Sequence, residues 1–150
     1  MPSPRPSVLF VCVSNRGKSV MAEGLAQQMA PGAFTASSAG TAAKIGAAPN
    51  DLSTAVLAEV GVDISTHEPR QLTDALMRAA DLTVVIGTAA RVTAPEGATV
   101  EVWETDEPSL RGIEGMDRMR LVRDEIAGRI ADLARRLGSV SSRPRPVQRP

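Results

Sequence analysis

The stretch Val-Leu-Phe-Val-Cys at residues 8–12, followed by Val-Ser-Asn-Arg-Gly-Lys-Ser at residues 13–19, decides the fold of this chain. Five consecutive apolar residues of this kind are typical of a strand buried on both faces of a parallel sheet. The polar, glycine-containing loop that follows leads into a helical pattern, in which Met21, Leu25 and Met29 recur at every fourth position. The stretch therefore predicts a strand, a loop and a helix in succession.

The rest of the chain repeats this alternation. Further strands are expected at residues 34–38, 82–86 and 99–102, and further helices at residues 50–60, 73–80 and 119–137. Alternating strands and helices form parallel sheets with helices on both faces. We therefore expect an α/β three-layer sandwich with a central four-stranded, mainly parallel sheet. Ligands of such folds bind beyond the carboxyl ends of the strands, which places Cys12 at the expected site.

Composition and charge exclude several classes of protein. The 150 residues fit one domain, and 43% of them are hydrophobic, which is enough for a core. Seventeen Lys and Arg balance 17 Asp and Glu, so the basic excess of a nucleic-acid binder is missing. The longest apolar run, residues 8–13, is too short to span a membrane, and no signal-peptide segment precedes it. We expect a cytoplasmic protein with a flexible leader at 1–7, one folded domain at 8–137 and a disordered tail at 138–150.

Cys12 is the only cysteine of the chain. An internal disulfide and a metal site built on a cysteine pair are therefore excluded. His67 is the only histidine, so a zinc site is not expected and no metal ligand is assigned.

The loop after Cys12 has the composition of an anion cradle. Backbone N–H groups at a helix N-terminus bind anions, and the same donors stabilise a thiolate placed among them. The residues expected to bind an oxyanion are Val13, Ser14, Asn15, Arg16, Gly17, Lys18 and Ser19. One alternative is that Cys12 is an inert core residue. Another is a nucleotide-binding P-loop, but Cys12 stands where that motif needs its first glycine.

The loop resembles the C-x5-R-[ST] signature of the low-molecular-weight protein tyrosine phosphatases and of the arsenate reductases that share their fold. The resemblance covers residues 8–137. The segments that carry it are residues 8–12, 21–24, 38–41, 63–67, 82–86 and 119–126.

Four departures from the family pattern point to one branch. Lys18 stands where the family has an arginine, and the positions of two further reductase cysteines look like Gly87 and Ala94. The chain has no tyrosine, whereas the phosphatases flank an aromatic substrate with tyrosines. The family's Asp-Pro pair appears as Asp106-Glu107-Pro108. With these features the chain resembles the arsenate–mycothiol transferases, which keep one cysteine and a C-x5-K-S loop.

This resemblance implies a chemistry and its partners. Cys12 would attack arsenate, Lys18 would hold the oxyanion, and Glu107 or Asp106 would handle the proton of the departing oxygen. Mycothiol would be the cosubstrate, and a glutaredoxin-like mycoredoxin would reduce the arseno-mycothiol adduct. No cofactor would be bound. A phosphatase acting on phosphotyrosine or small phosphoesters is the alternative enzyme, and a single-thiol redox sensor or anion-binding module is the non-enzymatic one.

Two further expectations concern the surroundings of the loop. In related arsenate reductases, positions like those of Asn15, Glu23, Ser38 and Asp63 gather around a potassium ion, so potassium could bind here. His67 is expected to fix the loop by hydrogen bonds rather than to act in catalysis.

Overall fold

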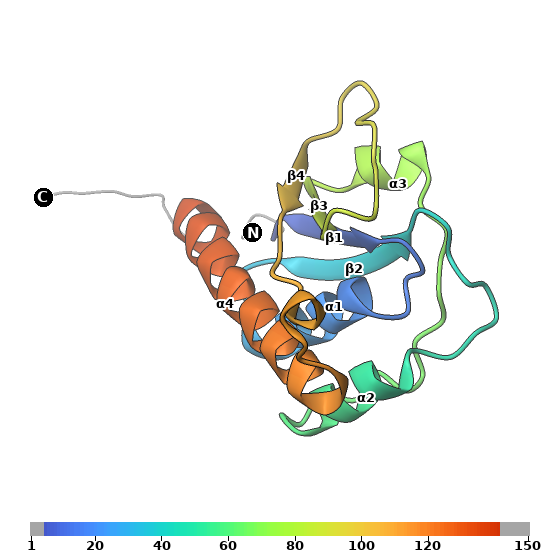
Figure 1. The fold of residues 1–150 in the computed structure, drawn as a ribbon. Coiled ribbons are helices and arrows are strands. Elements are labelled where there is room, and N and C mark those ends of the chain that lie inside the picture. Colours follow the sequence, from blue (N-terminus) through green and yellow to red (C-terminus); the bar gives the residue numbers. More distant parts are fainter. Residues whose placement is uncertain (1–4, 142–150) are drawn as a thin grey trace, which may run out of the picture.

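The computed structural model describes residues 5–141 of the chain (Figure 1). The elements in chain order are strand β1 (Ser7–Cys12), helix α1 (Lys18–Met29), strand β2 (Thr35–Gly40), helix α2 (Asp51–Ala58), helix α3 (Asp74–Ala79), strand β3 (Leu82–Ile86), strand β4 (Val100–Trp103), the 3-10 helix η1 (Pro108–Arg111) and helix α4 (Gly115–Ser141).

The four strands form one sheet in the order β2-β1-β3-β4, and every pair is parallel. The predicted α/β class and strand number are confirmed, and the sheet is wholly rather than mainly parallel. Cys12 pairs in register with Gly40, and Ile86 pairs with Trp103. Because all strands run the same way, their carboxyl ends meet at one edge of the sheet.

Two apolar cores enclose the sheet, because alternate residues of each strand face opposite sides. Phe10 and Val84 belong to the core that α1, α2 and α4 complete, and Leu9 and Val85 belong to the core that includes Met77 of α3. Figure 1 shows α1, α2 and α4 together on one side of the sheet and α3 on the other.

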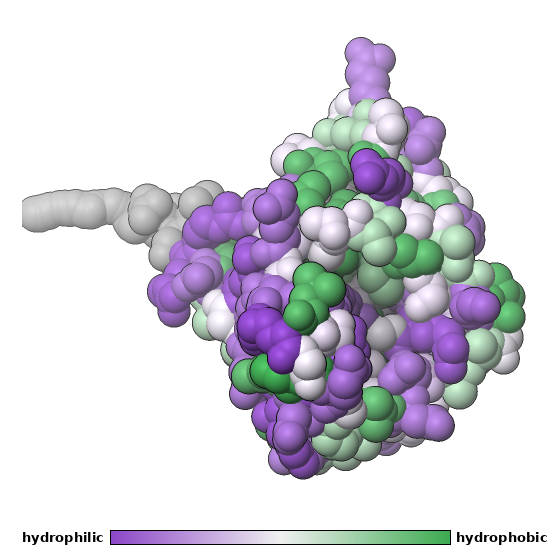
Figure 2. All heavy atoms as spheres, in the orientation of Figure 1, coloured by the Kyte–Doolittle hydropathy of each residue, from purple (hydrophilic) through white to green (hydrophobic). Residues whose placement is uncertain are grey.

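Helix α4 closes the larger core with one apolar stripe, as its spacing predicts. The buried residues of the stripe are Met119, Val122, Ile126, Ile130 and Leu133. Its opposite side is hydrophilic (Figure 2). In α1 the prediction is wrong at one position: Met21 and Leu25 are buried, but Met29 is 43% exposed because it lies in the last turn, beyond the sheet.

Two expected boundaries are also wrong by a few residues. Ser7 belongs to β1 rather than to a leader, and α4 continues to Ser141 rather than ending before residue 138. Composition suggests a tail there, but an established helix extends at low cost because each added residue gains one hydrogen bond. The remaining expectations for the leader and tail fall on residues 1–4 and 142–150, outside the described residues.

Within the described range, no helix combines the length and the apolar character that crossing a membrane requires.

Candidate active site

The nucleophile candidate lies where β1 ends and α1 begins. Cys12 is the last residue of β1 and is 8% exposed, and Lys18 is the first residue of α1. Gly17 occupies the N-cap position and gives this helix no side-chain cap. The first N–H groups of a helix have no partner within the helix, and the helix dipole makes this end positive. The 13–19 loop therefore offers an anion site next to the Cys12 sulfur.

The segment after β2 holds the loop from its outer side. The N–H groups of Thr41, Ala42 and Lys44 donate to the carbonyl oxygens of residues 12, 13 and 14 at 2.9, 2.8 and 3.1 Å. At Gly40 the two segments come so close that a Cβ atom would lie 2.5 Å from the Val13 carbonyl oxygen. These contacts turn the loop carbonyls away from the cleft, and they require glycine at position 40.

Asn15 anchors the loop from inside. It has the left-handed φ of 60° and is fully buried. Its amide nitrogen donates to Ser19 Oγ at 2.8 Å and to Ser38 Oγ at 3.0 Å, and its Oδ1 accepts the Arg70 N–H at 2.8 Å. The side chain of Asn15 thus points into the protein, and only its backbone remains near the proposed oxyanion.

His67 supports this anchor, which confirms its expected role. Its Nε2 lies 3.1 Å from both the carbonyl oxygen and the Oδ1 of Asn15. Both partners are acceptors, so Nε2 is the nitrogen that carries the hydrogen.

Ser19 connects the anchor to the nucleophile. Its Oγ lies 2.9 Å from Cys12 Sγ and accepts a hydrogen bond from Asn15. When the sulfur is in the thiolate form, only the Ser19 hydroxyl can donate in this contact.

A cleft of about 380 Å³ opens in front of Cys12. It is lined by Cys12, Val13, Ser14, Gly17, Lys18, Ile86, Gly87, Thr88, Ala89, Ala90, Thr105, Glu107 and Leu110. None of the side chains that line it, in the part of the chain that the structure describes, is aromatic. Leu110 is 86% exposed at the rim. Figure 2 shows small apolar areas separated by hydrophilic residues over this face.

Lys18 brings the positive charge of the cleft. Its Nζ lies 3.5 Å from Thr105 Oγ1 and 3.7 Å from Glu107 Oε1. On the opposite wall, Gly87 has a φ of +86°, and a Cβ atom there would come 3.5 Å from the same Nζ. A cysteine at position 87 would therefore meet backbone strain, and its Cβ would be in ordinary contact with the lysine.

The structure separates the two acid candidates. Glu107 lines the cleft, and its carboxylate accepts hydrogen bonds from Arg118 at 2.7 and 2.9 Å and from Ser109. These bonds, that with Arg118 above all, lower the pKa of Glu107 to about 2. Asp106 does not line the cleft and pairs with Arg111 at the surface, which lowers the pKa of Asp106 as well.

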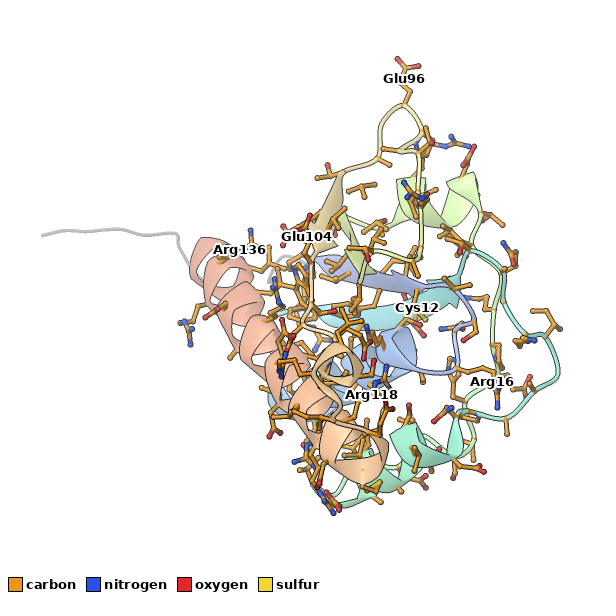
Figure 3. The ribbon with its side chains drawn as sticks, in the orientation of Figure 1. Cys12, Arg16, Glu96, Glu104, Arg118 and Arg136 are labelled. Carbon is orange, nitrogen blue, oxygen red and sulfur yellow. The ribbon has the colours of Figure 1, made fainter. Side chains whose placement is uncertain are left out.

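Arg16 points away from the Cys12 cleft. Its Nε donates to the Ala48 carbonyl at 2.6 Å, and its side chain lines a second cavity of about 160 Å³ with Asn50, Ser53 and Arg118. Figure 3 shows Arg16 apart from Cys12, on the side of the loop toward α2. In the described structure Lys18, not Arg16, is the cation of the cleft.

The residues expected around potassium largely bind one another. Asn15 donates to Ser38, and Ser38 donates to Glu23. Asp63 accepts the Ser65 N–H, and it lines a third cavity together with Glu23. Within residues 5–141 no three His, Cys, Asp or Glu side chains are grouped to hold a metal ion. A potassium site, whose oxygen donors belong to other residue types as well, stays a prediction.

Sequence reasoning missed several residues of the site, among them Arg118, Thr105 and Leu110. Arg118 was assigned no role, because an arginine on a charged helix face looks like solvated charge. Thr105 and Leu110 lie beside predicted elements, and no motif distinguishes them. The Asp106-Glu107-Pro108 motif is the signal that could have led to Arg118, since a carboxylate in a cleft requires a partner.

Comparisons with known proteins agree with this geometry. The sequence model of the family described as low molecular weight phosphotyrosine protein phosphatase matches residues 7–142. The probable low molecular weight protein-tyrosine-phosphatase EpsP of Ralstonia solanacearum is 40% identical over 81 residues, 54% of this chain and 55% of that protein. The chain thus matches only about half the length of this relative. An arsenate reductase of Staphylococcus aureus (strain Newman) is 30% identical over 125 residues, 81% of this chain and 91% of that protein.

The fold is also similar to solved structures. A thioredoxin-dependent arsenate reductase of Corynebacterium glutamicum, Cg_ArsC1', has 31% identity and a TM-score of 0.73, over 93% of this chain and 65% of that chain. Wzb of Vibrio vulnificus, in complex with benzylphosphonate, has 26% identity and a TM-score of 0.74, over 88% of this chain and 99% of that chain.

Proposed function

Because the chain belongs to the low molecular weight phosphotyrosine protein phosphatase family, we propose that it is a thiol-dependent arsenate reductase, an arsenate–mycothiol transferase. The observation that carries the proposal is that Cys12, at the base of an anion-binding cleft, is the only cysteine of the chain. A lone thiol can form one bond to arsenic, so a second thiol must come from solution.

The first step uses the groups of the cleft. Arsenate binds against the N–H groups of the 13–19 loop and the charge of Lys18, and the Cys12 thiolate attacks arsenic. Glu107, the acidic residue that lines the cleft, handles the proton of the departing oxygen. Asp106, which does not line the cleft and pairs with Arg111, is not assigned this role.

The second step transfers arsenic to the thiol from solution. The thiol displaces Cys12 from arsenic, which forms the arseno-thiol adduct and restores the Cys12 thiolate. Mycothiol is proposed because the Lys18-Ser19 pair of the loop and the run at residues 103–108 resemble the mycothiol-using branch. A mycoredoxin of the glutaredoxin type then reduces the adduct, because the chain has no second thiol that could do so.

A phosphatase is the second candidate, favoured by the 40% identity to EpsP over half of this chain. Two features weigh against it. No aromatic side chain lines the described cleft, and the chain has no tyrosine with which to flank a phosphotyrosine ring.

Arsenate turnover by the purified protein tests the proposal, with mycothiol, glutathione, or thioredoxin and its reductase as the reductant. We expect turnover that saturates with mycothiol, a much lower rate with thioredoxin, and none in Cys12→Ser, because the chain has no internal disulfide for thioredoxin to reduce. Turnover with thioredoxin alone, or phosphotyrosine hydrolysis without thiol-dependent arsenate chemistry, contradicts the proposal. Stoichiometric modification of Cys12 without turnover would indicate a redox sensor instead.

A further inference from the structure

Glu107 and Arg118 form a two-point ion pair at the edge of the cleft. Arg118 Nε lies 2.7 Å from Glu107 Oε2, and Arg118 Nη2 lies 2.9 Å from Oε1. Both side chains are about 30% exposed. A planar guanidinium that meets both carboxylate oxygens is the strongest form of this pair. Figure 3 places Arg118 below Cys12, at the start of α4.

Two further groups near the carboxylate also favour its charged form, against the opposing effect of its partial burial. Lys18 of α1 faces Oε1 at 3.7 Å, and both the N–H and the hydroxyl of Ser109 in η1 donate to Oε2. Asp106, the adjacent acid, is neutralised by Arg111. In this setting Glu107 holds no proton near neutral pH, with a pKa of about 2. It is a poor proton donor.

We infer that Arg118 is a positioning residue that keeps Glu107 as a proton acceptor, and so restricts the site to oxyanions that bring their own proton. The inference rests on the proposed function for the identity of the substrate, and it names the residue that sets the substrate class. Arsenate with hydroxyl groups fits this class, whereas a phosphate ester of a poorly acidic alcohol does not.

The attack on arsenate balances without a proton from the protein. The Sγ–As bond forms and one As–OH bond breaks, while arsenic stays in its pentavalent state. Dihydrogen arsenate carries a second hydroxyl; Glu107 accepts the proton of that hydroxyl and passes it to the departing oxygen, which leaves as water. Thiolate and dihydrogen arsenate thus give a dianionic thiol adduct and water.

The dianion of a phosphate ester, the form that predominates above about pH 6, carries no hydroxyl whose proton Glu107 could pass on. Its alkoxide or phenoxide must receive a proton as it departs, unless it is already a stable anion. A Glu107 that is held ionised cannot supply this proton. Activated esters are therefore expected to react far better than unactivated ones in this site.

The experiment compares 4-nitrophenyl phosphate, an activated ester, with phenyl phosphate, an unactivated one, in the wild type, Arg118→Met and Arg118→Lys. Arg120→Met is the matched control, because Arg120 of α4 also pairs with a glutamate, Glu59 at the end of α2, but lies outside the cleft lining. At pH 6.5, where the ester dianion predominates, about one Glu107 in 30,000 is protonated at a pKa of 2, against about one in 100 at the ordinary 4.5.

In Arg118→Met we expect the rate on phenyl phosphate, relative to that on 4-nitrophenyl phosphate, to rise at least about tenfold at pH 6.5. Arsenate turnover by the same variant should gain an acid limb near pH 4–5 that the wild type lacks. Arg118→Lys should move both readouts back toward the wild type, and Arg120→Met should change neither.

Two results overturn the inference: an unchanged ester ratio in Arg118→Met, or an equal change in Arg118→Met and Arg120→Met. A wild type that hydrolyses both esters equally well also overturns it. If the wild type turns over no arsenate with any thiol, the proposed function fails, but the ester ratio still tests the role of Arg118. Loss of both ester activities in Arg118→Met, with Arg118→Lys inactive as well, would assign Arg118 a purely structural role.

Discussion

The Cys12 sulfur contacts the hydroxyl of Ser19, seven residues later in the chain, and the same hydroxyl contacts the side-chain amide of Asn15. Ser19 Oγ lies 2.9 Å from the sulfur, and the Asn15 amide nitrogen donates to the same oxygen. Phosphate or arsenate should slow alkylation of the purified protein by iodoacetamide, because an oxyanion in the 13–19 loop would cover the sulfur. In Ser19→Ala the rate of alkylation at pH 7 should fall, because the thiolate loses a hydrogen-bond donor. Alkylation at a rate that neither oxyanion changes would contradict the role of Cys12.

The sequence identifies the members of the loop but not the direction of each side chain. Residues 13–19 lie around Cys12 as expected, yet Asn15 turns inward and Arg16 turns outward. The direction of the Asn15 side chain depends on its left-handed backbone and on Ser38 and Arg70, which contact Asn15 from distant parts of the chain. The direction of the Arg16 side chain depends on the Ala48 carbonyl. Spacing along the sequence contains no information about such contacts.

The end of β2 and the loop after β1 act as one unit, because Gly40 lets them approach each other. In Gly40→Ala the new Cβ would overlap the Val13 carbonyl and approach Asn15 N to 2.9 Å. We expect a loss of about 1–3 kcal/mol in the free energy of unfolding and a severe loss of oxyanion binding. Denaturant titration and phosphate binding measure the two effects.

Gly32→Ala is the matched control, since a Cβ atom there meets nothing within 4 Å. Its stability should stay within about 0.5 kcal/mol of the wild type, with phosphate binding unchanged. Equal behaviour of the two variants would show that the close approach at Gly40 is unimportant.

At the level of elements the sequence is a good guide where apolar periodicity is strong. The strands at 82–86 and 8–12 and the stripe of α4 agree with expectation, because core burial selects these residues. The 3-10 helix η1 is not predicted. Its four residues are too few for a periodic pattern, and Glu107 caps it through contacts with Ser109. The part of the site formed by residues 105–118 is therefore the part that sequence reasoning describes least.

The whole molecule should lose stability in a defined range of acid pH. Glu59 of the α2 end pairs with Arg120 and Arg123 of α4, which lowers its pKa to about 2. A pKa lowered by folding means that the ionised form stabilises the folded state. This contribution is complete above the ordinary value of 4.5 and disappears as the pH falls toward 2.

The melting temperature of the wild type should therefore decrease between pH 4.5 and pH 2. Glu59→Gln should show a lower melting temperature at pH 7 and a smaller decrease over the acid range, because the amide does not titrate. Thermal unfolding followed by circular dichroism at each pH makes the comparison. Parallel curves for the two proteins would indicate that the α2–α4 ion pairs do not stabilise the fold.

The distance along the chain between Cys12 and the far wall of its cleft has a consequence for the newly made protein. Leu110, the last residue that lines the cleft, comes 98 residues after Cys12. A ribosome that adds about 5–20 residues per second needs about 5–20 s to make the intervening segment. During that interval the sulfur exists without the wall that encloses it. The growing chain is then open to oxidants and electrophiles that the finished cleft keeps away from a cysteine only 8% exposed.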